Sequence, residues 1–172
     1  MDYRTPNQIA NYNQINQRPI ILIVLESPHV HEFVSPIGIL KNTITYKRFE
    51  SNLITKLLSS YIYGLINGKD YNVILANAVQ YQCSLGQSLK PNSSKEDRDN
   101  NWIDCFNTLS KDLLERIDLI KPEIVINLCT KGLVNLQLIL DNVLRPYCAQ
   151  KNIIYTYGTH PFTWSFNYSR IF

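Results

Sequence analysis

The sequence IILIVLESPHVHEF, residues 20–33, joins an unbroken apolar run to a cluster of ionisable side chains. The apolar part, Ile20–Leu25, is rich in β-branched residues and does not alternate with polar ones. Continuous apolarity of this length is typical of a strand that is buried on both faces, as in a parallel sheet. The polar part brings Glu26, His29 and His31 to the end of that strand, which is where parallel sheets bind their ligands.

Three further apolar runs follow the first one along the chain. They are YNVILANAV (71–79), EIVINLC (123–129) and NIIYTY (152–157). Helices are predicted at residues 47–66, 97–120 and 132–144. Strands that alternate with helices form βαβ units with right-handed crossovers. The sequence therefore predicts a three-layer α/β/α fold around a central, mainly parallel four-stranded sheet.

Length and composition indicate one globular domain. The 172 residues, 45% of them hydrophobic, are sufficient for a single core. We assign this domain to residues 19–172 and expect a polar N-terminal tail or arm at residues 1–18. The charged residues 90–101 are expected to form a solvated loop. A net charge of +3 is compatible with a polyanionic partner but does not indicate one.

The four cysteines contain no C-x-x-C pair, which argues against a zinc ribbon or a local iron–sulfur site. The polar start of the chain does not resemble a signal peptide. No apolar run reaches the roughly twenty residues that a membrane span needs. We therefore expect a cytoplasmic protein with reduced thiols and no membrane partner.

Two interpretations of the histidines after the first strand stay open. His29 and His31, together with His160, match the three protein ligands of a catalytic zinc site. The H-E-x-x-H pattern that would support such a site is absent. The alternative is a polar surface loop with no role in chemistry.

Asn77 lies inside the otherwise apolar run VILANAVQ. A buried amide must satisfy one acceptor and two donor positions. The side chain is either a structural amide bonded to neighbouring backbone or an amide that faces a ligand and reads a base edge. The residues alone do not separate these two roles.

The segment GTHPFTW, Gly158–Trp164, places a histidine, a proline and two aromatic residues just beyond the last strand. His160 is a candidate acid/base or anion-stabilising group. Phe162 and Trp164 are candidates for stacking on bases or for wedging a duplex. The alternative is that these aromatic side chains fold back into the core.

The third strand ends in Thr130, Lys131 and Gly132 before a helix. Such a turn can offer backbone N–H groups to a phosphate. The glycine spacing of a P-loop is missing, so an ordinary strand–helix turn is the alternative.

In their order along the chain, four segments resemble motifs of the uracil-DNA glycosylase superfamily. VLESPH (24–29) resembles its first-strand motif, and LANAVQYQCS (75–84) resembles the strand that carries its pyrimidine-reading asparagine. THPFTW (159–164) resembles its His-Pro-Ser loop, and KPEIVINLC (121–129) resembles the strand before its last helix. These four short segments are spread over residues 24 to 164.

The resemblance implies roles for individual residues. Glu26 stands where the family has Gln or Glu, and Pro28 matches the family's proline. Asn77 matches the asparagine that reads the base. His160 matches the histidine that stabilises the anion on O2 of the departing base.

The resemblance also implies which residues contact the base or the DNA. Ser27 and Phe33 are expected at the base. Phe33 is a candidate for stacking on the base, and Phe49 is the alternative for that role. Those expected at the DNA are Phe162, Thr163 and Trp164 in the penetrating loop, with Thr130 and Lys131 in the turn after the third strand.

This chain departs from the family pattern in three respects. Leu25 replaces the first glycine of the strand motif. Ser27 stands where the best-known branch has its water-activating aspartate. The cysteine set of the cluster-bearing branch is absent. The departures imply a divergent member, and they leave open a uracil target, a modified-pyrimidine target or a catalytically silent protein.

The resemblance implies a DNA glycosylase that hydrolyses the N-glycosidic bond of a flipped-out uracil or modified pyrimidine in duplex or single-stranded DNA. Glu26 would act on the cationic sugar and the attacking water, with His29 as second choice. His160 would stabilise the base anion. No metal or cofactor is implied, and we expect a monomer that serves in base-excision repair or in defence against phages.

The alternative is a catalytically silent module that binds nucleic acid or a protein on the same fold. Ser27 at the aspartate position is its main support. Salt-dependent affinity for DNA without formation of abasic sites would favour it.

Overall fold

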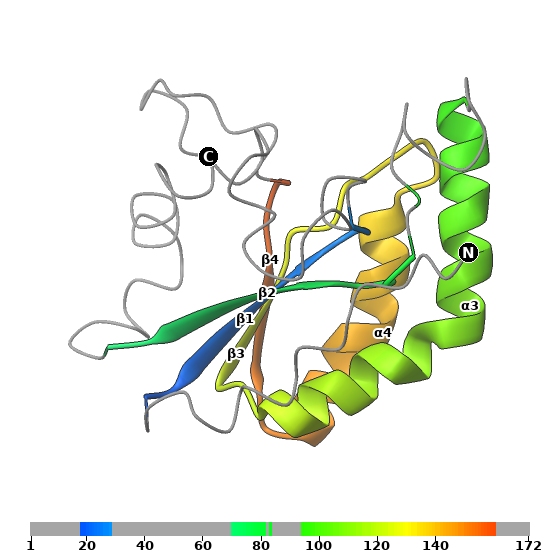
Figure 1. Cartoon of the computed structure of the whole chain (residues 1–172). Coiled ribbons are helices and arrows are strands. Elements are labelled where there is room, and N and C mark those ends of the chain that lie inside the picture. The colour runs from blue at the N-terminus through cyan, green and yellow to red at the C-terminus, as the bar shows by residue number, and fades with distance from the viewer. Residues whose placement is uncertain (1–17, 29–69, 82, 84–93, 161–172) are drawn as a thin grey trace, which may run out of the picture.

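The computed structural model of the chain describes residues 18–28, 70–81, 83 and 94–160 (Figure 1). These residues form a four-stranded, all-parallel sheet with the strand order β2-β1-β3-β4. The strands are β1 (Ile20–Leu25), β2 (Asn72–Asn77), β3 (Ile124–Asn127) and β4 (Ile154–Tyr157). The helices are α3 (Lys95–Ile120) and α4 (Leu136–Gln150). The predicted α/β fold with a parallel four-stranded sheet is confirmed, whereas the helix predicted at 47–66 and the tail at 1–17 lie outside the described residues.

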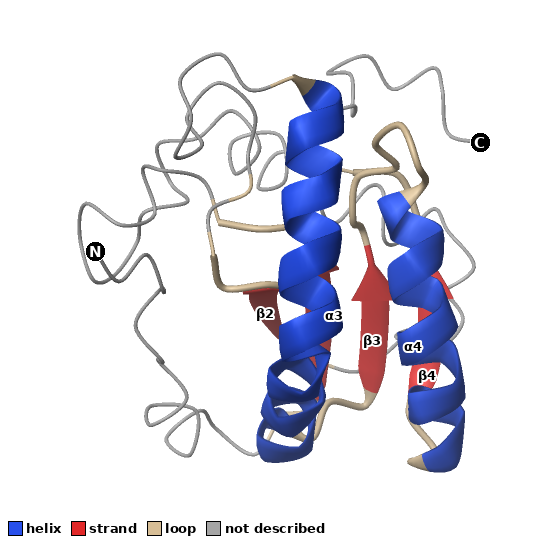
Figure 2. Ribbon diagram, turned by 90° about the vertical axis from the view of Figure 1, so that its right-hand side faces the viewer, coloured by secondary structure: helices blue, strands red, loops and turns tan. Residues whose placement is uncertain are grey.

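The direction of the connections explains why both helices lie on one face of the sheet. The chain passes from β2 through α3 to β3, and from β3 through α4 to β4, so both connections move the same way across the sheet. Right-handed crossovers that move the same way place their helices on the same side, as Figure 2 shows. The connection from β1 to β2 moves the opposite way, so the order reverses between β1 and β3. Parallel α/β sheets bind ligands at such a reversal, beyond the carboxyl ends of the strands.

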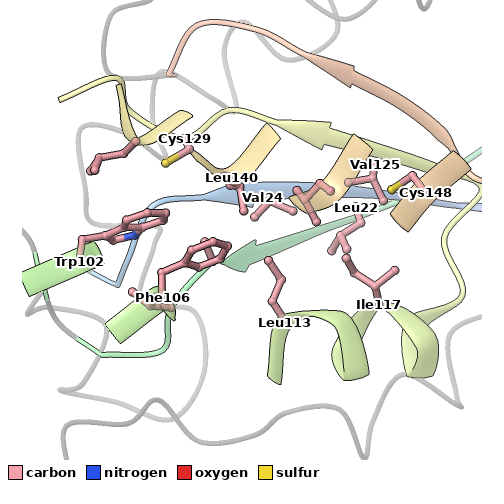
Figure 3. Packing of buried hydrophobic residues seen from close by; sticks show 14 of the residues in the cluster. Leu22, Val24, Trp102, Phe106, Leu113, Ile117, Val125, Cys129, Leu140 and Cys148 are labelled. Carbon is pink, nitrogen blue, oxygen red and sulfur yellow. The ribbon is translucent and has the colours of Figure 1, made fainter. Parts of the chain in front are cut away.

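Strand β1 alternates between two cores because its side chains point to opposite faces in turn. Leu22 and Val24 pack toward α3 and α4 (Figure 3). Ile21, Ile23 and Leu25 belong to a separate buried cluster on the other face. All five side chains are buried, so the continuous apolarity of the sequence follows from burial on both faces.

Helix α3 begins two residues before the position that the sequence predicted. Ser94 is its N-cap, and the side chains of Ser94 and Asp97 each accept a hydrogen bond from the other residue's backbone, which forms a capping box. The prediction of a solvated loop over residues 90–101 was wrong for the first turn of this helix, because Arg98 and Asp99 are buried. The helix ends where Lys121 adopts a left-handed conformation before Pro122.

Helix α4 differs from the predicted helix at both ends. It begins at Leu136 because Asn135 caps it, accepting a hydrogen bond from the backbone N–H of Leu138. It continues to Gln150 although Pro146 lies inside it. The sequence prediction of an end at residue 144 was wrong because the packing of the buried Leu144 and Cys148 against the sheet outweighs the cost of one proline.

None of the helices in residues 18–28, 70–81, 83 and 94–160 is long and apolar enough to cross a membrane.

We expect Pro146→Ala to raise the free energy of unfolding by about 1–3 kcal/mol, because alanine restores a backbone donor and removes the steric clash of a proline in the helix interior. Pro146 is exposed, so the substitution removes little packing. Urea denaturation followed by circular dichroism measures the effect. Gln150→Ala, at an exposed position of the same helix, is the control and should change stability by only a few tenths of a kcal/mol. A destabilised Pro146→Ala variant would contradict this account of the helix.

Candidate active site

The carboxyl ends of the four strands lie level with one another. Leu25 pairs with Asn77, Val24 pairs with Asn127, and Asn127 pairs with Tyr157. The residues just beyond these pairs therefore share one edge of the sheet. This edge carries both Glu26, which follows β1, and His160, which follows β4, although β3 lies between these two strands.

Glu26 is a buried carboxyl group, only 8% exposed, at the end of the central strand β1. By strand alternation its side chain follows Leu22 and Val24 toward the helices. The indole N–H of Trp102 donates a hydrogen bond of 3.0 Å to the Glu26 backbone carbonyl, which fixes this strand end against α3. Burial raises the pKa of Glu26 to about 7, while Arg98 and the Ser27 hydroxyl oppose the increase. Glu26 can therefore exchange a proton near neutral pH.

Arg98, in the first turn of α3, lies over the Glu26 carboxyl group. Its Nη1 is 3.6 Å from Oε2 of Glu26, a distance that makes an ion pair but not a hydrogen bond. Its Nε donates to the carboxylate of Asp99. Both charged side chains of this Arg98–Asp99 pair are at least nine-tenths buried. Asp99 therefore holds the guanidinium of Arg98 in place beside Glu26.

Asp99 also holds the turn that follows β3. Its Oδ2 accepts hydrogen bonds from the backbone N–H groups of Leu133 (2.5 Å) and Val134 (3.3 Å). A buried carboxylate thus occupies two of the N–H groups at this turn. The expectation that the turn offers its backbone to a phosphate is not supported at these two positions, because a second anion there would meet the Asp99 charge.

His160 lies three residues beyond the end of β4, and the positive charge of Arg98 affects its pKa as well. Burial, and then the charge of Arg98, lower the pKa of His160 to about 4. The imidazole is therefore neutral throughout the neutral pH range. A neutral ring presents one N–H donor and one acceptor, which is the form needed to donate a hydrogen bond to a developing anion without itself carrying charge.

The described residues place Asn77 on the other face of the sheet. Its neighbours Ala76 and Ala78 belong to the core beneath the helices, so alternation turns Asn77 toward the face of Leu75. The backbone carbonyl of Asn77 accepts a hydrogen bond of 2.9 Å from Arg116. Asn77 and Glu26 therefore end adjacent strands but lie on opposite faces, and the base-reading role of Asn77 stays a prediction.

The other predicted residues divide into two groups. Ser27 and Pro28 follow Glu26 directly, the first half-buried and the second buried. Thr130 is half-buried and Lys131 is exposed at the turn after β3. The residues outside the described part of the chain are His29, Phe33, Phe162, Thr163 and Trp164.

Sequence reasoning missed Arg98 and Asp99 as parts of the site. The signal that could have found Arg98 is its spacing, since it lies four residues before Trp102 and eight before Phe106, both on the buried stripe of α3. Trp102 and Phe106 stack with ring centroids 4.7 Å apart beneath this edge. Asp99 carried no comparable signal, because its role depends on a turn more than thirty residues later.

All four cysteines are described and free. Burial raises the pKa values of Cys83, Cys129 and Cys148, so these thiols are poor nucleophiles at neutral pH. Among the residues that the structure describes, no group of three or more His, Cys, Asp or Glu side chains is arranged to hold a metal ion. The zinc alternative depends on histidines outside those residues.

No protein-family model matches this chain, and no curated protein or solved structure matches it either.

Gly132→Ala should lower the free energy of unfolding by about 2 kcal/mol or more, because Gly132 combines a positive φ of 63° with a crowded position. A Cβ atom there would lie 2.5 Å from Oδ2 of Asp99. Denaturant titration measures the loss. The matched control is Gly158→Ala, where the nearest atom is Cδ2 of the Leu128 side chain at 3.0 Å, and this change should cost less. Equal stability of the two variants would contradict the proposed anchoring of the turn.

Glu26→Gln should stabilise the protein increasingly as the pH rises. The folded-state pKa of Glu26 is about 7 and its ordinary value is 4.5. The stability contributed by protonated Glu26 is therefore complete below pH 4.5 and is lost as the pH rises through 7. Between pH 4 and pH 8 the unfolding free energy of Glu26→Gln relative to wild type should grow by about 3 kcal/mol.

Urea denaturation at a series of pH values tests this prediction. Glu115→Gln, at an exposed position of α3, is the control and should show a nearly constant difference from wild type. A constant difference for Glu26→Gln as well would show that Glu26 titrates normally.

Proposed function

We propose that this chain is a DNA glycosylase that hydrolyses the N-glycosidic bond of a flipped-out uracil or modified pyrimidine. The observation that carries the proposal is the arrangement of Glu26, Arg98 and neutral His160 at the carboxyl edge of the sheet. The sequence resemblance in residues 24–29 and 159–164 supports it, since Glu26 and His160 are the residues in those motifs to which the resemblance gives catalytic roles.

The reaction requires electrostatic stabilisation of two opposite charges, one on the sugar and one on the base. Departure of the base leaves a cationic, oxocarbenium-like sugar, and it leaves negative charge on the base. An ionised Glu26 makes the group of Glu26, Asp99 and Arg98 net negative by one charge, which favours a nearby cation. Burial in a site of low dielectric strengthens this effect compared with water.

Proton transfer is the second task of Glu26. A carboxylate with a pKa near the working pH is well suited to take a proton from an attacking water. The oxygen of that water bonds to C1′ of the sugar, and its proton passes to the Glu26 carboxylate. This role does not need the aspartate that Ser27 replaces, because Glu26 lies at the adjacent position.

His160 is assigned to the departing base. Its neutral imidazole donates a hydrogen bond to the oxygen where negative charge develops. A low pKa keeps the ring neutral, so the hydrogen bond strengthens as charge develops on the base, which is the condition for lowering the barrier.

The test is release of free base from a panel of oligonucleotide duplexes and single strands that contain uracil or modified cytosines and uracils. We expect abasic sites with at least one member of the panel. Glu26→Gln and His160→Ala should each lower the single-turnover rate by about 10²-fold or more, because each removes a group that acts in the transition state. Wild-type kcat/KM should rise with pH through about 7, as Glu26 loses its proton.

Asp118→Asn is the matched control for this assay. Asp118 pairs with Lys151 at 2.9 Å, and both side chains are about half exposed. Asp118 lies in the last turn of α3 and Lys151 directly follows α4, so both are near the helix ends that lead into β3 and β4, at the opposite edge of the sheet. This variant should retain wild-type activity. Salt-dependent DNA binding without base release from any member of the panel would replace the enzyme with a binding module.

A further inference from the structure

Helix α3 carries two buried arginines, and their contacts differ in kind. Arg116 donates from Nε to Asp112 and from its two Nη atoms to the backbone carbonyls of Asn77 and Ala78. All three nitrogens of this guanidinium therefore hold protein atoms together. Arg116 acts as a structural clamp on the end of β2.

Arg98 uses only one edge of its guanidinium in this way. Its Nε donates to Asp99, while Nη1 only approaches Glu26 at 3.6 Å. A guanidinium has five N–H donors. Within residues 18–28, 70–81, 83 and 94–160, the Nη edge of Arg98 makes no hydrogen bond, although the side chain is only 10% exposed.

Asp99 fixes the direction of that edge. Its carboxylate is held by the N–H groups of Leu133 and Val134, and it occupies the space that a Cβ atom at Gly132 would need. A planar guanidinium held through Nε cannot rotate freely, so its Nη atoms keep one orientation. The Nη edge is therefore preorganised before any ligand arrives.

The Nη edge faces Glu26, and the charge of Arg98 also acts on His160. Arg98 is close enough to His160 to act electrostatically on the imidazole, and it forms the ion pair with Glu26. A neutral histidine offers a dipole to a developing anion, whereas an arginine offers a full positive charge. In a buried site, a full positive charge stabilises a developing anion more strongly than the dipole of a neutral donor does.

We propose that Arg98 is a catalytic residue that stabilises the negative charge on the departing pyrimidine, with Asp99 as its positioning residue. This inference rests on the proposed function. As the bond from C1′ to the base nitrogen breaks, its electron pair passes to the base. The resulting charge is shared between the His160 N–H and the Nη atoms of Arg98, while water adds to C1′ and its proton passes to Glu26.

The test compares two leaving groups in single-turnover base release from matched oligonucleotides. One contains uracil, and the other contains 5-fluorouracil, whose anion is intrinsically more stable. A residue that stabilises the departing anion matters less when the anion is already stable. Arg98→Met should lower the uracil rate by about 10²–10³-fold, and it should lower the 5-fluorouracil rate by a factor at least about ten times smaller.

Two further variants separate chemistry from folding. Arg98→Met combined with Asp99→Asn removes both charges of the pair, so the Asp99 carboxylate is not left buried without its partner. This double variant should show the same unequal losses while remaining folded by circular dichroism. Arg116→Lys, which weakens the structural clamp, should lower both rates by one common factor.

The outcomes distinguish this inference from the proposed function. Unequal losses in the Arg98 variants and equal losses in Arg116→Lys support a direct role for Arg98. Equal losses for the two leaving groups in a folded Arg98 variant would overturn that role and leave the glycosylase intact. Absence of base release by wild-type protein from both oligonucleotides would overturn the inference together with the proposed function for these bases.

Discussion

The buried ion pair between Arg98 and Asp99 connects the parts of this structure that the site needs. Asp99 accepts hydrogen bonds from the turn after β3, and Arg98 reaches the end of β1. One adjacent pair of residues in α3 thus ties two neighbouring strand ends to the helix that covers them. Buried ion pairs contribute little to stability on balance, because desolvation offsets much of their attraction. The value of this pair lies in the fixed geometry that it imposes around Glu26.

That geometry explains why two titratable groups at one edge shift in opposite directions. Burial disfavours charge on any group, so it raises the pKa of a carboxyl and lowers the pKa of an imidazole. The positive charge of Arg98 limits the first shift and adds to the second. The result is a carboxyl group with a pKa near 7 and a neutral histidine at the same edge of the sheet. Such divergence between titratable groups of one site is a feature of acid–base chemistry.

The sequence predicted the strands well and the polar contacts poorly. The continuous β-branched runs predicted β1 at its observed bounds and the other three strands to within a few residues. They did so because burial on both faces requires apolar residues at every position. Helix α4 was harder, since Pro146 and the cap at Asn135 depend on tertiary packing and turn conformation. Glu26 and His160 were predicted as site residues because they follow apolar runs. Arg98 and Asp99 were missed because their partners lie far away in the sequence, and no local pattern marks a charge that will be buried.

The central position of β1 has a consequence for synthesis of the chain. This strand is made first, yet its neighbour β3 lies about a hundred residues later, and Trp102, which fixes its end, lies 76 residues after Glu26. Contacts of such long sequence separation form late and slowly. On the ribosome, Glu26 therefore remains hydrated, with the acidity of an ordinary carboxyl group, until α3 and β3 have emerged and docked. The nascent chain acquires the raised pKa of Glu26 only when the sheet has closed around β1, so partly made protein carries this carboxyl group with its ordinary titration.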